Sequence, residues 1–440
     1  MASAGVYMIG FLGFILRICL LNTPIPKWLQ SNNEVTTPMT SWERVEEGIA
    51  LQEKSISPYS GDLFHETPLA LCIMKSALYF PWKIDGFFIV IDILTMIFMC
   101  KTATVFVKYL KEFTQSEKKN YDSKANSLLS SVNKESLAWI PFAVVACYAL
   151  NPLSIVTLLA KSTAMISNLM TILTMYHMIK GNWFFCTLFL SLAAYQTFYP
   201  FVFIVPISLR FLKLSKPKSP SFISFEAVKS YLQTLSLFLV FLSLLLGASY
   251  AMEGSWDFLM STYGFILTVP DLTPNAGVFW YFFTEMFDHF RLFFVCVFQF
   301  NAILYTLPLS VKFSDKPIFL MYILIFLTSI FKSYPSYADA SLYLSFLPFW
   351  KHTFSYMRNT LVVGAMYFCC AVLAPILYHL WIYAGSANAN FYFAITLTYT
   401  TAQIFLVTDL LYAYLRREYD LFNGIDHRNA DGSKAQLILE

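Results

Sequence analysis

The chain has 440 residues, of which 57% are hydrophobic and only 13% are charged. A water-soluble domain carries about 25% charged residues, so this composition excludes a large soluble domain and indicates a membrane protein. The formal net charge is +3, and no basic run alternates with aromatic residues. The charge therefore gives no reason to expect a nucleic-acid partner.

Several apolar segments have the length of about 20 residues that a helix needs to cross the hydrocarbon core of a bilayer. The first, residues 2–21, lacks a basic start and an A-x-A cleavage site, so we expect a retained span. The clear candidates are residues 2–21, 86–107, 139–160, 231–251, 278–311, 361–382 and 391–415. Shorter or proline-interrupted candidates are residues 68–80, 166–179, 183–212, 317–331 and 340–350. These segments predict an all-α fold, a single polytopic membrane helical bundle over residues 1–440 with about ten to twelve crossings.

The orientation follows from lysine and arginine, which are enriched in short cytosolic loops. Lysines are concentrated in residues 101–136, and a second basic run occupies residues 210–218. We therefore predict that the Lys-rich loop at 101–136 and the tail at 416–440 are cytosolic. The predicted luminal loops are then residues 22–67, residues 252–277 and the turn at 385–390.

The first luminal loop contains an amphipathic segment. Trp42, Val45, Ile49 and Gln52 recur at helical spacing, with carboxylates between them. Such a segment is expected to form an interfacial helix that lies on the bilayer surface. Two interpretations remain open. The loop is part of a site for a glycan or a lipid head group, or it is an interfacial strut with solvated charges.

His65 and Glu66 end this loop, close to Asp62. Sugar transferases with a multi-span body and an acidic first luminal loop use paired carboxylates to hold a metal ion or to act as a base. The loop contains no D-x-D motif, and His65 is equally suited to brace the turn. No Ser-His-Asp or Cys-His arrangement, P-loop or HExxH motif occurs in the chain, so we expect no catalytic residue, metal or cofactor.

Two other luminal segments carry polar groups that suit a ligand. Asp257 follows Trp256 at the start of a predicted helix, where an N-cap is favoured over a contact with a ligand hydroxyl. The last turn combines Ser386 with the amides of Asn388 and Asn390, which match sugar hydroxyls and phosphates. An ordinary polar turn between two spans explains the composition of the last turn equally well.

Ionisable residues inside the predicted spans need partners, because a charge in hydrocarbon costs roughly 2.5–3.5 kcal/mol. Glu285 and His289 are four residues apart on one predicted helix and are expected to bond each other. For Asp85, Asp92 and Asp409 we expect helix–helix contacts. The eight cysteines lie in apolar segments without CxxC spacing, so we expect buried small residues instead of disulfides or metal ligands.

Seven runs spread over essentially the whole chain resemble the PIG-U family of GPI transamidase subunits. The runs are Ser57 to Ser60 (SPYS), Phe64 to Leu69 (FHETPL), Gly264 to Asn275 (GFILTVPDLTPN), Phe290 to Gln299, Phe331 to Pro335 (FKSYP), Trp381 to Asn388 (WIYAGSAN) and Leu415 to Tyr419 (LRREY). Runs of this length in seven places are highly specific. The charged loop at 108–134 is least like the family pattern.

The resemblance implies a fold related to the GT-C glycosyltransferases without their acidic catalytic motif. It implies a non-catalytic subunit in the endoplasmic reticulum membrane that binds and presents the GPI lipid for attachment to precursor proteins. The complex would supply catalysis through a Cys-His protease-like subunit, so the partners would be the other transamidase subunits, the GPI lipid and membrane phospholipid. Positioning of this kind is itself a catalytic contribution.

The family's GPI-contacting turn corresponds to Ser386, Asn388 and Asn390 in this sequence. Asp257, His65 and Glu66 are weaker GPI-binding candidates near the same luminal face. Lys216 and Lys218 are candidates for contact with anionic lipid head groups at the cytosolic surface.

Two other functions compete with this prediction. A GPI-pathway mannosyltransferase of GT-C type would need Asp62 or Glu66 as a base, and the missing acidic pair disfavours it. A transporter or scramblase would use Glu285, Asp288 and His289 as a polar path, but no inverted repeat supports it.

Overall fold

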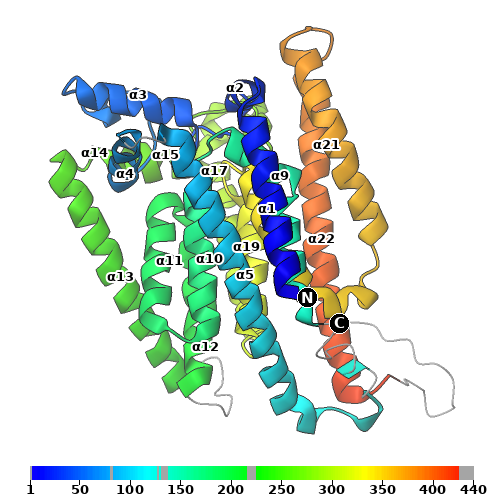
Figure 1. Cartoon of the computed structure of the whole chain (residues 1–440). Helices are drawn as coiled ribbons and strands as arrows, with labels where there is room; N and C mark the ends of the chain where they lie inside the picture. The colour runs from blue at the N-terminus through cyan, green and yellow to red at the C-terminus, as the bar shows by residue number, and fades with distance from the viewer. Residues whose placement is uncertain (1, 80–82, 126–127, 130–136, 216–223, 426–440) are drawn as a thin grey trace.

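The computed structural model describes residues 2–79, 83–125, 128–129, 137–215 and 224–425, and these residues form an all-helical bundle without strands (Figure 1). Six helices in the described part of the chain are long and apolar enough to cross a membrane. They are α1 (Ala2–Leu21), α5 (Lys83–Glu117), α13 (Phe225–Glu253), α17 (Asp288–Leu304) continued by α18 (Thr306–Lys312), α21 (Thr360–Ile382) and α22 (Ala389–Asn423). The pair α8 (Ile140–Ala149) and α9 (Pro152–Leu159), bent by 48°, would make a seventh span.

Shorter helices fill the space between these spans. They include α4 (Pro68–Leu78), α10 (Ala164–Lys180), α11 (Trp183–Thr197), α12 (Ile204–Ser215), α19 (Pro317–Phe331) and α20 (Tyr337–Phe346), with the 3-10 segments η4 (Tyr199–Phe203) and η6 (Leu347–Tyr356). The polytopic all-α fold is therefore confirmed. The count of ten to twelve crossings stays a prediction, because it depends on whether these shorter helices cross.

The centre of the bundle is α19, which packs against α12, α17, α20 and α22. Every residue of α19 except Phe331 is buried. A helix that is apolar on all sides is stable only when protein or lipid surrounds it completely. Because neighbouring helices surround α19, its 15 residues need not match the thickness of a bilayer.

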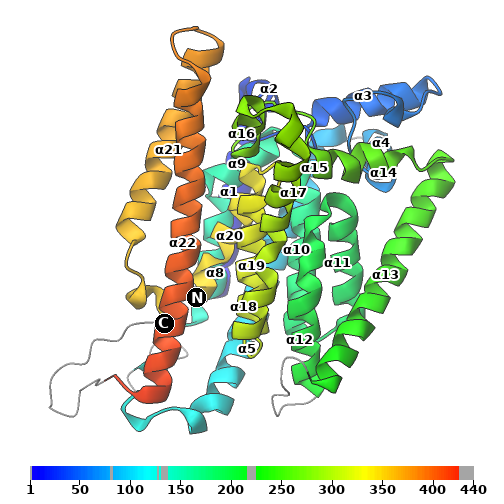
Figure 2. The same ribbon diagram turned by 180° about the vertical axis from the view of Figure 1, so that it is seen from behind.

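The bundle has two ends (Figures 1 and 2). One end carries the helices α2 (Ile25–Gln30), α3 (Trp42–Glu53), α14 (Asp257–Leu259), α15 (Phe265–Thr268) and α16 (Phe279–Glu285), together with the turn between α21 and α22. We name it the loop end. The other end, which we name the lysine end, carries the C-termini of α5, α12 and α22. There Asp122 N–H donates to the Leu421 carbonyl at 3.0 Å, and the rings of Tyr121 and Phe422 meet, so the ends of α5 and α22 are tied together.

The amphipathic helix of the first loop is α3, which lies across the loop end (Figure 1). Its apolar residues Trp42, Val45 and Ile49 are buried, and they pack with Phe64 and Phe88 in one core cluster. The apolar face therefore packs on protein and not on the bilayer. Glycine at position 48 permits this packing, since a Cβ there would lie 2.6 Å from the ring of Phe64.

The predicted span at 278–311 is broken. The structure ends α16 at Glu285, gives Met286 an extended backbone, and begins α17 at Asp288. The prediction that Glu285 and His289 pair is therefore wrong, because the two residues do not share a helix. Both side chains are exposed, as is Asp288. An exposed position at the loop end removes the reason for treating them as a path through the membrane.

The three acids contact other segments as predicted, although Asp85 is exposed and only the contact of Asp92 joins two helices. Asp92 on α5 pairs with Arg17 on α1 at 2.9 Å, and Asp85 pairs with Lys161 at 2.9 Å. Asp409 on α22 accepts the backbone N–H groups of Arg358 and Asn359 at 2.9 Å, just before α21 begins. Each carboxylate thus has a partner from another segment, and for the buried Asp92 and Asp409 this partner avoids the cost of an isolated charge.

The cysteines differ from the prediction in burial. All eight are free thiols, but only Cys186 and Cys370 are buried, and five are exposed on apolar helices. Sequence hydrophobicity does not distinguish a side chain that faces lipid from one that faces the core, because both surroundings are apolar.

Candidate functional site

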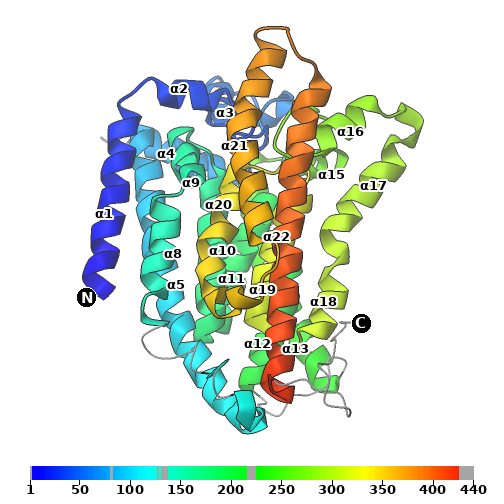
Figure 3. The same ribbon diagram turned by 90° about the vertical axis from the view of Figure 1, so that its right-hand side faces the viewer.

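The turn between α21 and α22 projects farthest at the loop end (Figure 3). The N–H of Ser386 and the N–H of Ala387 both donate to the Leu380 carbonyl, at 2.9 and 3.2 Å. Gly385 has φ +63°, a conformation that a side chain disfavours. These bonds satisfy carbonyls that the last turn of a helix leaves free and fold the turn tightly.

Asn388 and Asn390 begin α22, and both are exposed. The side-chain oxygen of Asn388 accepts the N–H of Asn390 at 3.1 Å, so Asn388 is the N-cap of α22. Tyr281 on α16 donates its hydroxyl to the side-chain oxygen of Asn390. The turn therefore presents amide and hydroxyl groups on a backbone that is already hydrogen-bonded.

Aromatic rings fix the base of this turn. Tyr281 stacks on Phe393 at 4.1 Å between ring centroids, and Trp280 stacks on Trp381 at 5.8 Å. Tyr392 completes the group, with its ring 5.8 Å from that of Trp280. Stacked aromatic pairs are worth about 0.5–1.5 kcal/mol each beyond their buried area. They hold α16 against the α21–α22 hairpin.

Glu34 connects the first loop to this hairpin. One oxygen of its carboxyl group accepts the hydroxyl of Tyr392 at 2.5 Å, and the other accepts the hydroxyl of Tyr337 at 2.8 Å. Glu34 is only 5% exposed, and burial raises the pKa of its carboxyl group. The sequence analysis did not select Glu34, because its partners Tyr337 and Tyr392 lie far away in the chain. The one signal available was its position within the uncharged stretch at 28–42.

His65 and Glu66 lie elsewhere at the loop end. Glu66 accepts the hydroxyl of Thr163 and, at 3.0 Å, the side-chain amide of Gln196, and burial raises the pKa of Glu66 to about 7. His65 contacts the Ser261 carbonyl through Nδ1 at 2.8 Å and stacks on Phe265 at 3.5 Å. Burial lowers the pKa of His65 to about 4. Both side chains are buried and brace the loop against α10 and α15, as the bracing interpretation of His65 expected.

The remaining predicted site residues are not brought together with the turn. Asp257 is exposed and is the first residue of α14, where Trp256 occupies the N-cap position without a side-chain cap, so the predicted capping role is wrong. Lys216 and Lys218 lie outside the described residues. Of the predicted set, only Ser386, Asn388 and Asn390 share one surface.

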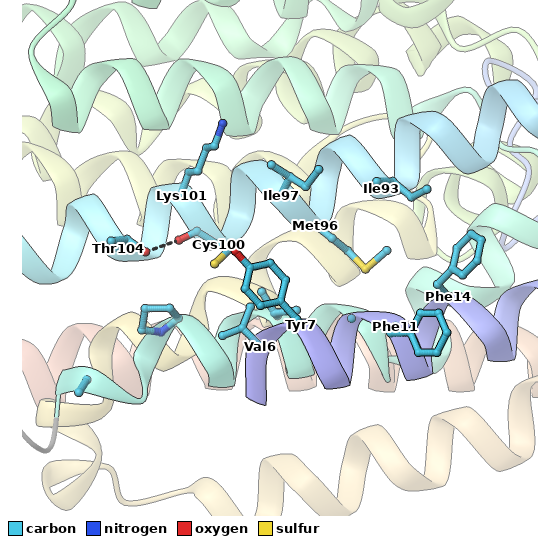
Figure 4. Close-up of a pocket in the computed structure, with 14 residues that line it drawn as sticks. Val6, Tyr7, Phe11, Phe14, Ile93, Met96, Ile97, Cys100, Lys101 and Thr104 are labelled. Atoms are coloured by element: carbon cyan, nitrogen blue, oxygen red, sulfur yellow. Dashed lines mark hydrogen bonds between the residues drawn. The ribbon is translucent and has the colours of Figure 1, made fainter. Parts of the chain in front are cut away.

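In the part of the chain that the structure describes, two of the cavities open between the spanning helices. The larger, of about 660 Å³, lies between α1, α5 and α8, where Tyr7, Phe11 and Phe14 gather beside Met96 and Cys100 (Figure 4). Its walls are apolar apart from the ends, and the ammonium of Lys101 lies 4.9 Å from the centre of the Phe98 ring. The second, of about 420 Å³, lies between α2, α9 and the α21–α22 hairpin and includes Glu34.

The fold and these polar surfaces define a multi-pass helical membrane protein with a polar turn at one end of a lipid-facing hairpin. The family model described as "GPI transamidase subunit PIG-U" matches residues 11–399, and the chain belongs to this family. The human protein "GPI-anchor transamidase component PIGU" is 40% identical over 446 residues, which covers 100% of each chain. The Cricetulus griseus protein of the same name is 41% identical over 97% of each chain. "GPI transamidase component GAB1" of Saccharomyces cerevisiae is 30% identical over 95% of each chain.

Proposed function

We propose that this chain is a non-catalytic subunit of GPI transamidase that binds the GPI lipid and presents its head group to a catalytic partner subunit. The observation that carries the proposal is the Ser386–Asn390 turn. It stands at the projecting end of a hairpin whose sides are apolar, so a lipid lying along the hairpin places its head group at the turn. Amide and hydroxyl side chains there match the hydroxyls and phosphates of a glycolipid.

A non-catalytic role is supported by the surroundings of the possible nucleophiles and bases. Within the described residues, no serine or cysteine side chain is hydrogen-bonded to a histidine. Of the two bases that a mannosyltransferase could use, Asp62 is exposed, whereas Glu66 is buried and already accepts hydrogen bonds from Thr163 and Gln196. A base must be within hydrogen-bond reach of the proton that it removes, and Glu66 is occupied by these contacts.

The proposal includes a topology and a compartment. The loop end would face the lumen of the endoplasmic reticulum, with the luminal loops at 22–67 and 252–277, and the lysine end would face the cytosol. The predicted cytosolic Lys-rich loop at 101–136 and tail at 416–440 begin within helices, because α5 continues to Glu117 and α22 to Asn423. Lys101, Lys108 and Lys111 lie on the half of α5 that ends at the lysine end, which supports this orientation. Lys216 and Lys218 would meet anionic phospholipid there.

Depletion of this protein in cells tests the proposal. We expect fully mannosylated, ethanolamine-bearing GPI to accumulate together with uncleaved precursor proteins, because the lipid is complete but is not attached. A truncated glycan that lacks a mannose would instead identify a mannosyltransferase and overturn the proposal.

A further inference from the structure

The cavity of about 420 Å³ is a groove between α9 and the α21–α22 hairpin. Ala371 and Phe368 of α21 form one wall, and Val156 of α9 belongs to the opposite wall. Phe368 is 71% exposed, so the groove opens sideways toward the bilayer. Ala371 lies roughly 16 Å before the end of α21 at a rise of 1.5 Å per residue, so the groove extends well into the membrane.

The groove changes character along its length. Its deep part is lined by aliphatic and aromatic groups, whereas Asn32 and Glu34 lie at the loop end. No lysine, arginine or histidine is among its lining residues in the described chain. This polarity matches a lipid whose chain lies in the deep part and whose uncharged hydroxyl groups reach the loop end. Because the described lining offers no cation, the phosphate that joins the chain to the ring would lie on the open side of the groove, in contact with solvent.

Glu34 is built into the groove as an acceptor. Tyr337 and Tyr392 hold its two carboxyl oxygens from α20 and α22, so its orientation is fixed. Each carboxylate oxygen has two lone pairs, and each uses one for a tyrosine. A buried acceptor of this kind is stabilised by further donors, and hydroxyl groups of a sugar or inositol ring would supply them.

The size of the groove matches a lipid chain. The groove provides about 420 Å³. Cavities of a few hundred Å³ are typical of sites for small amphipathic molecules.

We propose that this groove binds one acyl chain of a phospholipid whose head group carries ring hydroxyls, with Glu34 accepting hydrogen bonds from that head group. The α21–α22 hairpin, which forms one wall of the groove, ends in the Ser386–Asn390 turn, so the same lipid reaches the turn with the outer part of its head group. The inference rests on the proposed function, that the chain binds the GPI lipid, and adds the place of the lipid chain and the acceptor that recognises the ring.

Three substitutions test the groove and its acceptor. Ala371→Trp fills the groove, and Ala371 is exposed, so the larger side chain is accommodated without strain in the core. Ala365→Trp is the matched control, because Ala365 is an exposed alanine of the same helix that does not line the groove. Glu34→Gln keeps the shape of the side chain but replaces one of its two acceptor oxygens by an NH2 donor.

The test uses the complete transamidase complex in phosphatidylcholine nanodiscs. Phosphatidylinositol or phosphatidylcholine with a diazirine in one acyl chain is added, and labelled peptides of α9 and α21 are quantified after irradiation. We expect the inositol lipid to label these peptides, Ala371→Trp to reduce the labelling about tenfold, which equals about 1.4 kcal/mol, and Ala365→Trp to leave it unchanged. Glu34→Gln should reduce labelling by the inositol lipid to the level of the choline lipid.

Labelling that is insensitive to Ala371→Trp, or equal labelling of the wild type by both lipids, would overturn the inference. Size-exclusion chromatography of each variant complex establishes that it has assembled. The same samples are assayed for anchored protein. If the groove is not labelled but complexes that lack this chain fail to attach GPI to precursor proteins, the groove assignment is wrong and the proposed function stands. Normal anchoring without this chain would refute the proposed function itself.

Discussion

Arg17 on α1 and Asp92 on α5 form an ion pair of 2.9 Å in which the side chains are only 1% and 2% exposed. Arg17 also donates to the Ala149 carbonyl at 2.6 Å and to the hydroxyl of Ser154 at 2.8 Å. The hydroxyl of Tyr148 donates to Asp92 at 2.8 Å. One arginine thus connects the first helix to α5, α8 and α9 through groups that have no access to water.

Replacing Arg17 by methionine should lower the stability of the protein by about 3–5 kcal/mol, because Asp92 is left as an uncompensated buried charge. Thermal unfolding of the purified protein, followed by size-exclusion chromatography, measures the effect. The double variant R17M/D92L should recover most of the loss. Lys108→Ala is the control, since Lys108 pairs with Glu112 at an exposed site and should cost at most about 0.5 kcal/mol. A Tm for R17M equal to that of K108A would contradict the structural role.

His65 and Glu66 should give opposite dependences of stability on pH. Burial raises the pKa of Glu66 from 4.5 to about 7, so the folded protein holds a proton there that the unfolded chain has released. The contribution of Glu66 to the free energy of unfolding therefore falls as pH rises from 4.5 to about 7. Burial lowers the pKa of His65 from 6.5 to about 4, so its contribution rises with pH across that range.

These two contributions offset each other between about pH 4.5 and 6.5, and single substitutions should reveal each one. Glu66→Gln should leave a stability that rises with pH, and His65→Asn should leave one that falls. Chemical denaturation at several pH values between 4 and 8 measures both slopes. Parallel pH profiles of the two variants would refute this prediction.

Asn390→Ala should reduce the yield of GPI-anchored protein while leaving assembly of the complex intact, because the side chain is exposed and supports no buried contact. Cells that express the variant are assayed for anchored product and for the co-purified complex. Asn388→Ser is the comparison, since serine preserves the N-cap of α22 while removing the amide. An unchanged yield with Asn390→Ala would exclude Asn390 from the GPI site.

Asp409→Ala should loosen the start of α21. The carboxylate accepts the N–H groups of Arg358 and Asn359. Its removal leaves both donors without their acceptor, which should lower the free energy of unfolding by at least about 1–3 kcal/mol. We expect faster amide hydrogen exchange at 358–363, with little change in α13. Equal protection of these amides in the variant and the wild type would show that Asp409 does not hold the helix start.

Gly13→Ala should weaken the contact between α1 and α8, because the added Cβ would lie 2.8 Å from the Cβ of Ala149 and 2.9 Å from its carbonyl oxygen. Backbone atoms cannot move aside as a flexible side chain can, so α1 must shift. Gly247→Ala in α13 is the matched control, since nothing lies within 4 Å of the position. We expect a lower Tm for G13A and an unchanged or higher Tm for G247A.

The sequence was sufficient to predict the helical membrane fold, the Ser386–Asn390 turn and the helix at 42–53, because each depends on a local pattern. It did not predict which side of a helix faces protein. Trp42, Val45 and Ile49 have the same spacing whether they lie on lipid or on Phe88, and Cys296 and Cys186 occur in equally apolar runs. Only the tertiary contacts distinguish these cases.

Two further features needed the three-dimensional structure. The break at Met286 lies in an aromatic-rich segment without proline or glycine, so no helix-breaking residue indicated that Glu285 and His289 separate. Glu34 acquires its role from Tyr337 and Tyr392, which lie about 300 residues or more away in the sequence. Contacts over such separations leave no periodic pattern in one sequence.

The lengths of the helices have a practical consequence. α1 has 20 residues and is about 30 Å long, whereas α5 and α22 have 35 residues each and are about 52 Å long. A hydrocarbon core of about 30 Å leaves about 20 Å of the two longer helices outside it, and their far ends are tied by the bond between Asp122 and Leu421. These two protruding helix ends offer an epitope for an antibody fragment. A bound fragment would serve as an orientation marker in electron micrographs while leaving the loop end uncovered.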